Sequence, residues 1–403
     1  MSTRTVAGGI TAPAGYTAAG VSCGIKPSGR PDLGIVASDR LASAAAVFTT
    51  NLAQAAPVLI SRDHLERSGG RARAIVVNSG CANACTGADG MAHAASMARQ
   101  TSASLPCRPE EVLVASTGVI GVKLDMAKVC RGITDAAKAL SYSGGPAAAV
   151  AIMTTDPFPK EAAVESSLGA SPFRVGGMAK GSGMIEPMMA TMLGFVTTDA
   201  QVDPALLQRA LEAAVNDTFN AITVDGECST NDCVFLLANG ASGATVTENE
   251  GYQELVAALT AVCEALAIGI VRGGEGATKL IAVTVRDARS SDGARQVART
   301  IANSPLVKTA VHGADPNWGR IVAAAGRSGV VFDVNRTTIR VGGVLLFENG
   351  LPHDEAAPQA AEHLQGRTVQ VDVGLGTGGG ASATIWTCDL SAEYVRINGE
   401  YRT

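Results

Sequence analysis

The sequence predicts an α/β fold built from packed layers of helices and strands. Strand-like and helix-like runs alternate, as in the strand-like residues 74–77 and 112–116 and the helix-like residues 90–100 and 126–140. Such alternation is typical of helices that pack on a sheet. Hydrophobic residues make up 46% of the chain but aromatic residues only 4%, so we expect an interior of Ala, Val, Leu and Ile.

The pattern changes after residue 280, which predicts a second domain. Three strand-like runs and one helix-like segment follow, at residues 281–286, 338–341, 368–373 and 292–303. A chain of 403 residues is long enough for two or three domains. We therefore predict a structural core of about residues 1–280 and a smaller α/β domain of about residues 281–403.

Charge and hydropathy narrow the function to small-molecule chemistry in the cytoplasm. The net charge is -5, and Lys and Arg are nowhere denser than the spaced pair Arg71 and Arg73, which argues against nucleic acid or an anionic membrane as partner. Residues 255–271 form the longest apolar stretch, but it is short for a membrane span and contains Glu264, so we predict a buried helix. The start of the chain is polar and Gly-rich, unlike a signal peptide.

Nine cysteines are scattered along the chain, and we expect them to be small buried thiols rather than disulfides. The pairs Cys81/Cys85 and Cys228/Cys233 have spacings that suit a metal, but no histidine lies nearby in the sequence. We therefore predict no metal site.

Two glycine-rich stretches resemble nucleotide-binding loops without fitting them. Residues 374–379 match the spacing G-x-G-x-x-G, but a strand-like run follows where a dinucleotide site needs a helix, so we predict a hairpin connection. Residues 273–279 lack the Gly-Lys-Ser/Thr order of a phosphate loop.

One junction has the pattern of an activated nucleophile. The Gly-rich residues 175–183 lead to Thr191, which immediately precedes the strand-like residues 192–198. Glycines permit close backbone approach before the hydroxyl, and a buried strand gives rigid support after it. An ordinary loop followed by a strand threonine fits the local pattern as well.

Motifs along the chain favour the first interpretation. They are Asn78-Ser-Gly80, Ala82-Asn-Ala84, residues 116–121, Met153-Thr-Thr-Asp156, Pro159-Lys160, residues 180–193, residues 228–232, residues 274–279, residues 303–309, residues 315–320 and residues 398–403. These motifs, in this order, resemble those of the ornithine acetyltransferase family, the bifunctional glutamate N-acetyltransferases of arginine biosynthesis. The resemblance runs from about residue 20 to the last residue.

The resemblance implies a precursor that cleaves itself between Ala190 and Thr191, giving fragments 1–190 and 191–403. It also implies an αββα-type layered core, a smaller C-terminal domain and a dimer of cleaved pairs. Cleavage would leave Thr191 with a free α-amine of pKa about 8, which can take the proton of its hydroxyl.

The site residues are carried over from the same resemblance. Thr117 and Gly118 would form the oxyanion hole beside the nucleophile Thr191. The implied substrate-binding residues are Thr154, Lys180, Thr191, Glu275, Asn398 and Thr403. We expect Lys180 to face the substrate carboxylate, or else to lower the pKa of the Thr191 amine, and Glu275 or the C-terminal carboxylate of Thr403 to face the ammonium.

The expected reaction is a ping-pong transfer of acetyl from N-acetylornithine to glutamate through an acetyl-enzyme. No cofactor is expected, and acetyl-CoA is a possible second donor. The alternatives are a self-processing aminopeptidase or amidase, in which water captures the acyl group, and a non-catalytic binding protein.

Three residues depart from the family pattern, and one motif has no chemical role. Cys81, Glu186 and Met188 stand where the family has other residues, with Asn common at the first and often found at the last. For residues 315–320 we predict a structural turn that packs Trp318.

Overall fold

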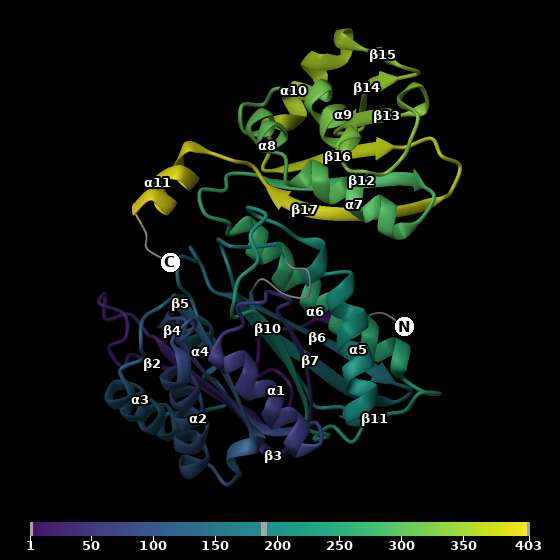
Figure 1. The fold of residues 1–403 in the computed structure, drawn as a ribbon. Coiled ribbons are helices and arrows are strands. Elements are labelled where there is room, and N and C mark those ends of the chain that lie inside the picture. The colour runs from purple at the N-terminus through teal and green to yellow at the C-terminus, as the bar shows by residue number, and fades with distance from the viewer. Residues whose placement is uncertain (1–2, 187–191, 401–403) are drawn as a thin grey trace. The chain divides into compact units, whose positions relative to one another are not determined.

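The computed structural model describes residues 3–186 and 192–400, which fold into two compact units. The first unit comprises the described residues up to Asn220 together with Glu227–Ile270, and the second comprises Ala221–Gly226 and the described residues from Val271 onward (Figure 1). Division of the chain into cleavage fragments stays a prediction.

A nine-stranded sheet organises the first unit, in the order β1-β6-β7-β8-β10-β3-β4-β5 with β2 paired to β3. Its strands are β1 (Arg4–Thr5), β2 (Tyr16–Val21), β3 (Leu33–Phe48), β4 (Arg71–Cys81), β5 (Val112–Val119), β6 (Lys160–Leu168), β7 (Ser171–Lys180), β8 (Leu193–Thr198) and β10 (Cys233–Ala238). The first half of β3 pairs with β2, and its second half pairs with β10. The long strand β3 therefore joins two wings of the sheet.

Helices cover both wings. They are α1 (Ala56–Ser68), α2 (Gly87–Ser104), α3 (Met126–Lys138), α4 (Gly145–Ala151), α5 (Pro204–Asn216) and α6 (Tyr252–Arg272), with short 3-10 turns at Pro109–Glu111 and Phe219–Ala221 and a two-stranded ladder of β9 (Gln201–Val202) and β11 (Thr245–Val246). Figure 1 shows α5 and α6 on one side of the strands and α2 and α3 on the other.

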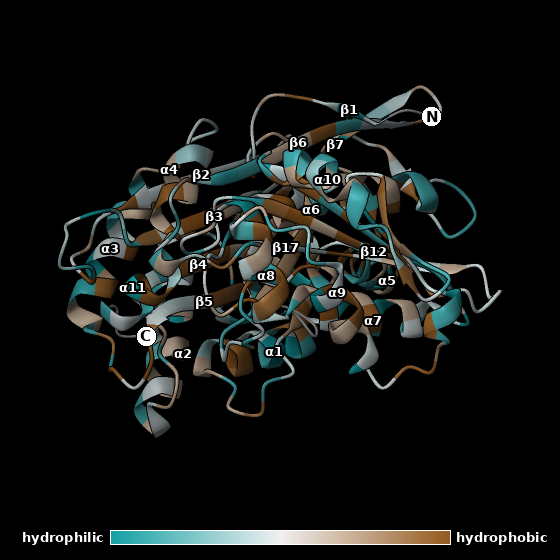
Figure 2. Cartoon of the chain, turned by 90° about the horizontal axis from the view of Figure 1, so that it is seen from above, coloured by the Kyte–Doolittle hydropathy of each residue, from teal (hydrophilic) through white to brown (hydrophobic). Residues whose placement is uncertain are grey.

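Two apolar layers confirm the predicted αββα architecture. Between the wings, Ile75 of β4 and Leu113 of β5 belong to one core with Phe195 of β8 and Phe235 of β10. A second core joins the opposite face of β4 and β5 to α2 and α3. Across the other wing, α6 packs so closely on β7 that a side chain at Gly177 would meet it. Apolar residues gather on these inner strands (Figure 2).

The predicted buried helix is α6. Its buried residues Leu255, Leu259, Val262 and Leu266 recur at helical spacing, and Glu264 on another face is exposed. Among the described residues it is the one helix long and apolar enough to cross a membrane, and half of that stretch is buried within the protein. Packing on the sheet accounts for its apolar composition.

The second unit contains a six-stranded sheet in the order β15-β14-β13-β16-β12-β17. Its elements are β12 (Leu280–Ala288), α7 (Ser291–Ala302), α8 (Pro305–His312), α9 (Trp318–Gly326), a 3-10 turn (Val334–Arg336), β13 (Thr338–Val341), β14 (Val344–Glu348), β15 (Leu351–Pro352), a second 3-10 turn (Asp354–Ala356), α10 (Ala357–Leu364), β16 (Thr368–Gly374), β17 (Ala381–Cys388) and α11 (Ala392–Glu400). Strands β12, β13 and β16 share an apolar core with α7 and α9.

The predicted hairpin at residues 374–379 is wrong. A strand does follow the glycines, but β16 and β17 do not pair with each other, because both pair with β12, which lies between them. The connection passes over the end of β12, where the backbone N–H of Leu375 donates to Arg286 and that of Thr377 to Asp287. Gly379 fits against the carbonyl of Ala288, where a Cβ would lie 2.1 Å from the oxygen.

The motif at residues 315–320 is the predicted structural turn. Asn317 caps α9 by accepting a hydrogen bond from the backbone N–H of Arg320, and its amide donates to Asp315. Trp318 stacks on Phe347 of β14 with ring centroids 4.9 Å apart.

Phe235 should be among the residues on which the first unit depends. Its ring is fully buried and contacts Phe195 and Phe48 at centroid distances of 5.8 and 6.0 Å. We expect Phe235→Ala to destabilise the protein by about 3 to 5 kcal/mol, since it removes apolar surface and leaves a cavity. Urea denaturation measures this, with Leu52→Ala as the fully exposed control. Equal unfolding midpoints for the two variants would contradict the proposed core.

Candidate active site

Strands β4 and β5 approach unusually closely where the predicted oxyanion residues lie. Gly118 has a φ of 127°. A Cβ at this position would lie 2.4 Å from the carbonyl carbon of Gly80 and 2.6 Å from the backbone nitrogen of Cys81. The pairing of β4 with β5 is irregular at this point. Glycine at 118 is therefore required by both backbone conformation and space.

The structure brings together two of the predicted site residues, Thr117 and Lys180. Lys180 Nζ donates to Thr117 Oγ1 at 3.2 Å, and both side chains are buried. A hydroxyl that accepts from an ammonium keeps its own proton free to donate elsewhere. Thr117 can thus act as a donor, which is the role that an oxyanion hole requires.

Asp156 organises the segment that carries Thr154. Its carboxylate accepts from the backbone N–H of Thr154 at 2.9 Å and of Gly181 at 2.7 Å, and Lys160 Nζ donates to it at 2.5 Å. The loop with Thr154 is therefore tied to the end of β7, next to Lys180. Burial raises the pKa of Asp156, but the charges of Lys180 and Lys160 and the hydrogen bonds outweigh it and lower the pKa to about 2.

Asn231 connects the end of β4 to Ser116, the residue before Thr117. Its amide nitrogen donates to the carbonyl oxygens of Ala82 at 2.6 Å and Ser116 at 2.9 Å. The Ser116 hydroxyl also donates to Asn78 at 2.6 Å. The backbone beside Thr117 is thus fixed by two buried amide side chains.

Asp232, the next residue, is a buried carboxyl in the same region. Burial raises its pKa well above the usual range, although hydrogen bonding from Ser229 and the charge of Lys180 act in the opposite direction. Asn231, Asp232 and Asp156 lie in motifs that resemble the family, but the sequence predicted no role for these residues. The signal that could have indicated such a role is the position of these polar residues shortly before strand-like runs.

The predicted cleavage residues Ala190 and Thr191 lie outside the described residues, as does Met188. The flanking strands are well defined. Lys180 at the end of β7 pairs with Leu193 at the start of β8, and Leu193 pairs with Cys233 at the start of β10. Strand β8, which begins two residues after Thr191, therefore lies between Lys180 of β7 and Cys233 of β10.

The second unit brings together Glu275 and Asn398, two further predicted substrate-binding residues. Asn398 Nδ2 donates to Glu275 Oε2 at 2.8 Å. Gly276 and Ser391 hold this loop against the start of α11, because Ser391 Oγ donates to the Gly276 carbonyl at 2.6 Å. Thr403 lies outside the described residues.

Asp389 anchors the same loop. It accepts from the backbone N–H groups of Thr278 and Lys279, both at 2.8 Å, and lies 2.7 Å from Nδ1 of His312. Three described side chains therefore fix the position of Glu275 within the unit: Asp389, Ser391 and Asn398.

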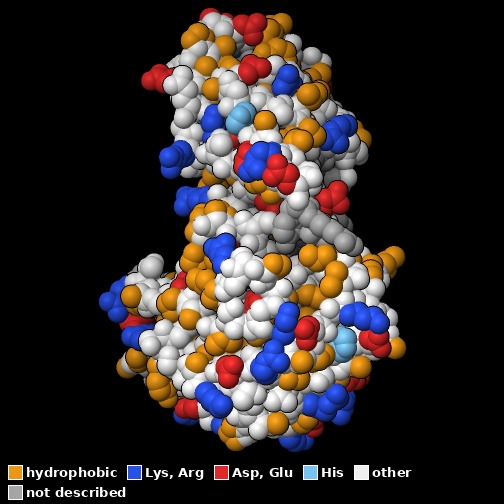
Figure 3. All heavy atoms as spheres, turned by 90° about the vertical axis from the view of Figure 1, so that its left-hand side faces the viewer, with side chains coloured by type: hydrophobic (Ala, Val, Ile, Leu, Met, Phe, Trp, Pro, Cys, Tyr) orange, Lys and Arg blue, Asp and Glu red, His pale blue; other side chains and the backbone are white. Residues whose placement is uncertain are grey.

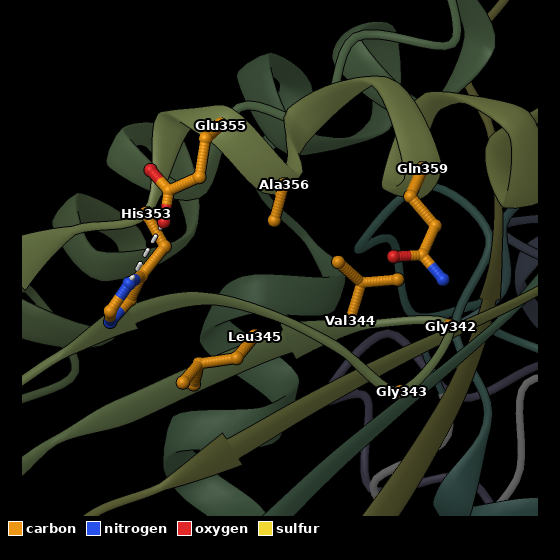
Figure 4. A pocket seen from close by; sticks show the side chains of 8 residues that line it. All are labelled: Gly342, Gly343, Val344, Leu345, His353, Glu355, Ala356 and Gln359. Atoms are coloured by element: carbon orange, nitrogen blue, oxygen red, sulfur yellow. Dashed lines mark ion pairs between the residues drawn. The ribbon is translucent and has the colours of Figure 1, made fainter.

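The remaining features of the described residues are the cysteines, the surface charges and one groove. All nine cysteines are free, and no group of His, Cys, Asp and Glu within residues 3–186 and 192–400 could hold a metal ion. Lys and Arg alternate with Asp and Glu on the face shown in Figure 3. A groove of about 590 Å³ in the second unit is lined by none of the described site residues that were predicted (Figure 4). It contains an ion pair between His353 and Glu355, and the Glu355 side chain is mostly exposed to solvent.

Comparison with known proteins identifies the family. Residues 17–403 match the ArgJ family. The chain belongs to the ArgJ family. The arginine biosynthesis bifunctional proteins ArgJ of Synechococcus sp. and Symbiobacterium thermophilum are 52% and 51% identical to it, each over 99% of this chain and 98% and 99% of their own.

A solved structure agrees with this assignment. The crystal structure of arginine biosynthesis bifunctional protein ArgJ from Bacillus halodurans matches with a TM-score of 0.51 and 43% identity, over 52% of this chain and 100% of its own. The protein is thus an acyltransferase of arginine biosynthesis, as the motifs predicted.

The ion pair of Asp156 and Lys160 should stabilise the first unit. We expect Lys160→Met to destabilise it by about 3 to 5 kcal/mol at neutral pH, because it leaves a buried carboxylate without its partner. Since the folded pKa of Asp156, about 2, lies below its ordinary 3.8, the wild-type contribution is present above about pH 4 and is lost as the pH falls toward 2.

Urea denaturation at several pH values measures both effects. Lys123→Met is the matched control, since Lys123 pairs with Asp89 on the surface, where solvent screens the charges. If the free energies of unfolding of Lys160→Met and the wild type differed by a constant amount down to pH 2, this role of Asp156 would be contradicted.

Proposed function

We propose that this ArgJ family member is a glutamate N-acetyltransferase that cleaves itself between Ala190 and Thr191 and then uses Thr191 as nucleophile. The observation that carries the proposal is the contact between Lys180 and the Thr117 hydroxyl at the edge where the chain enters β8. This contact supports the proposal, because a hydroxyl that accepts from Lys180 can donate to an oxyanion, and Lys180 pairs with the first residue of β8, which begins just after Thr191.

The transfer would proceed in two half-reactions. The Thr191 hydroxyl attacks the acetyl carbonyl of N-acetylornithine, and its α-amine takes the hydroxyl proton. Thr117 and the Gly118 N–H stabilise the oxyanion, ornithine departs, and the amine of glutamate then takes the acetyl group. General-base assistance of this kind contributes roughly 10² to 10⁴ in rate, and each oxyanion donor about 10² to 10³.

Self-cleavage is supported by the length of the solved relative. The matched Bacillus halodurans chain aligns in full, yet it spans only 52% of this chain. A fragment from Thr191 to Thr403 would also be a little over half of the 403 residues. The attack of the Thr191 hydroxyl on the Ala190 carbonyl would use the same oxyanion donors as the transfer reaction.

Substrate recognition requires both signs of charge, because N-acetylornithine has a carboxylate and a distant ammonium. Lys180 is the proposed partner of the carboxylate, with Thr154 beside it. Glu275, oriented by Asn398, or the carboxylate of Thr403 is the proposed partner of the ammonium.

The other parts of the proposal concern the second donor and the assembly. Relatives are named bifunctional, which supports use of acetyl-CoA as well as N-acetylornithine. The reaction as written needs no metal or organic cofactor. We propose a cytoplasmic protein assembled as a dimer of cleaved pairs. Acetyl transfer to glutamate, assayed separately from N-acetylornithine and from acetyl-CoA, distinguishes a one-donor from a two-donor enzyme.

Thr191→Ala should abolish both cleavage and transfer, because it removes the only hydroxyl that performs them. Intact-mass measurement should give two fragments for the wild type, one beginning at Thr191, and a single 40.8 kDa chain for the variant. Thr245→Ala, at an exposed position of β11, is the matched control and should be cleaved normally. A wild-type protein that stays in one piece after long incubation rejects the proposal.

Lys180→Met should raise KM for N-acetylornithine by about 10- to 100-fold, the loss expected for a hydrogen bond to a charged group. Steady-state kinetics across pH is the measurement, with Lys123→Met as control. If Lys180 instead lowers the pKa of the Thr191 amine, the acid limb of the profile moves to higher pH in the variant. Normal maturation together with unchanged kinetics would exclude both roles.

A further inference from the structure

Asp232 is fixed at the same sheet edge as Lys180 by backbone contacts on both sides. Its carbonyl oxygen accepts from the backbone N–H of Thr49, the residue after β3, at 3.0 Å. The next residue, Cys233, donates its N–H to the carbonyl of Met192 at 3.1 Å. Asp232 therefore precedes the row of paired residues that contains Lys180, Leu193 and Cys233.

The Asp232 carboxyl is only 3% exposed, and its Oδ2 has no hydrogen-bond partner in the described protein. An unsatisfied buried polar atom costs about 1 to 3 kcal/mol. Two other buried carboxylates of this unit have partners on both oxygens: Asp32 accepts from four backbone N–H groups, and both oxygens of Asp199 accept from backbone. Among the described residues of this unit, Glu161 Oε1 also lacks a partner, but it lies in β6, away from the row that contains Lys180, Leu193 and Cys233. The Asp232 oxygen is therefore available to a group outside the described residues.

The protonation state of the Asp232 carboxyl decides whether it can donate a proton. The charge that acts on it comes from Lys180, and the neighbouring titratable group is the buried Cys233 thiol. Burial raises the pKa of the Asp232 carboxyl more than the Ser229 hydrogen bonds and the charge of Lys180 lower it, which favours the protonated form. An uncharged acid beside an oxyanion site is a proton donor.

We propose that Asp232 donates a proton to the nitrogen that leaves when the amide bond of the acetyl donor breaks. This inference rests on the proposed acetyl transfer. As the C–N bond breaks, the Asp232 O–H bond breaks and an N–H bond forms, so ornithine departs as an amine and Asp232 becomes a carboxylate. In the second half-reaction the carboxylate takes one proton from the amine nitrogen of glutamate as the new C–N bond forms. The proton of the nucleophile is exchanged separately with its own base.

The test compares leaving groups. N-acetylornithine expels an amine, which needs a proton, whereas p-nitrophenyl acetate expels p-nitrophenolate, which does not. In Asp232→Asn we expect the transfer rate from N-acetylornithine to fall by about 10² to 10⁴, the usual contribution of a general acid. The burst of p-nitrophenolate, which reports acetylation of the nucleophile, should keep its wild-type rate. Asp232→Glu, which retains the acid, should recover part of the transfer rate.

Asp199→Asn is the matched control, since Asp199 is a buried carboxylate that follows the other end of β8. It should lower Tm without changing the ratio of the two rates. Equal losses with both donors in Asp232→Asn, or no loss with either, would overturn the proposal, because a structural role affects both reactions alike.

Maturation separates this proposal from the proposed function. Cleavage also expels an amine, so Asp232→Asn should mature more slowly than wild type by intact mass. A variant that stays uncleaved supports the proposal if its Tm is that of wild type and Asp232→Glu is cleaved; an uncleaved variant with a lowered Tm overturns it. Failure of the wild type itself to cleave or to transfer acetyl would reject the proposed function instead.

Discussion

Burial of charge at one edge of the first unit's sheet is the constraint on which the candidate site depends. Lys180, Lys160 and Asp156 are all buried there, and a buried charge is tolerated only when it is paired and hydrogen-bonded. Asp156 meets this requirement by binding Lys160 together with the backbone of Thr154 and Gly181. The same carboxylate therefore neutralises the edge and connects the two segments that carry Thr154 and Lys180.

The backbone geometry of β5 depends on similar polar contacts. Gly80 and Gly118 allow two strands to approach within a distance that excludes any side chain, and the amides of Asn231 and Asn78 hold the adjacent Ser116. Thr117 is thus presented by a rigid segment rather than by a loose loop. Preorganised donors are effective because they need not reorient while charge develops on the substrate oxygen.

The second unit shows the same principle on a smaller scale. Asp389 is fully buried and accepts from the loop that contains Glu275. Asn398 of α11 donates to the carboxylate of Glu275 itself. Both groups of predicted binding residues are therefore supported by a buried carboxylate that binds backbone N–H groups. Such support fixes a loop position that the loop sequence alone would leave variable.

The sequence by itself determined the α/β class, the buried helix α6, the family and several strands, among them β4, β5, β8, β12, β13 and β16, because periodicity and motifs are local properties. Its motifs also identified Thr117, Gly118 and Lys180, which the tertiary structure brings together. Only the tertiary structure decided that β12 separates β16 from β17, that Asn231 bridges two segments distant in sequence, and that Asp232 retains an unbonded oxygen. Strand partners and the burial of a single oxygen depend on residues far apart in the chain, and no local pattern records them.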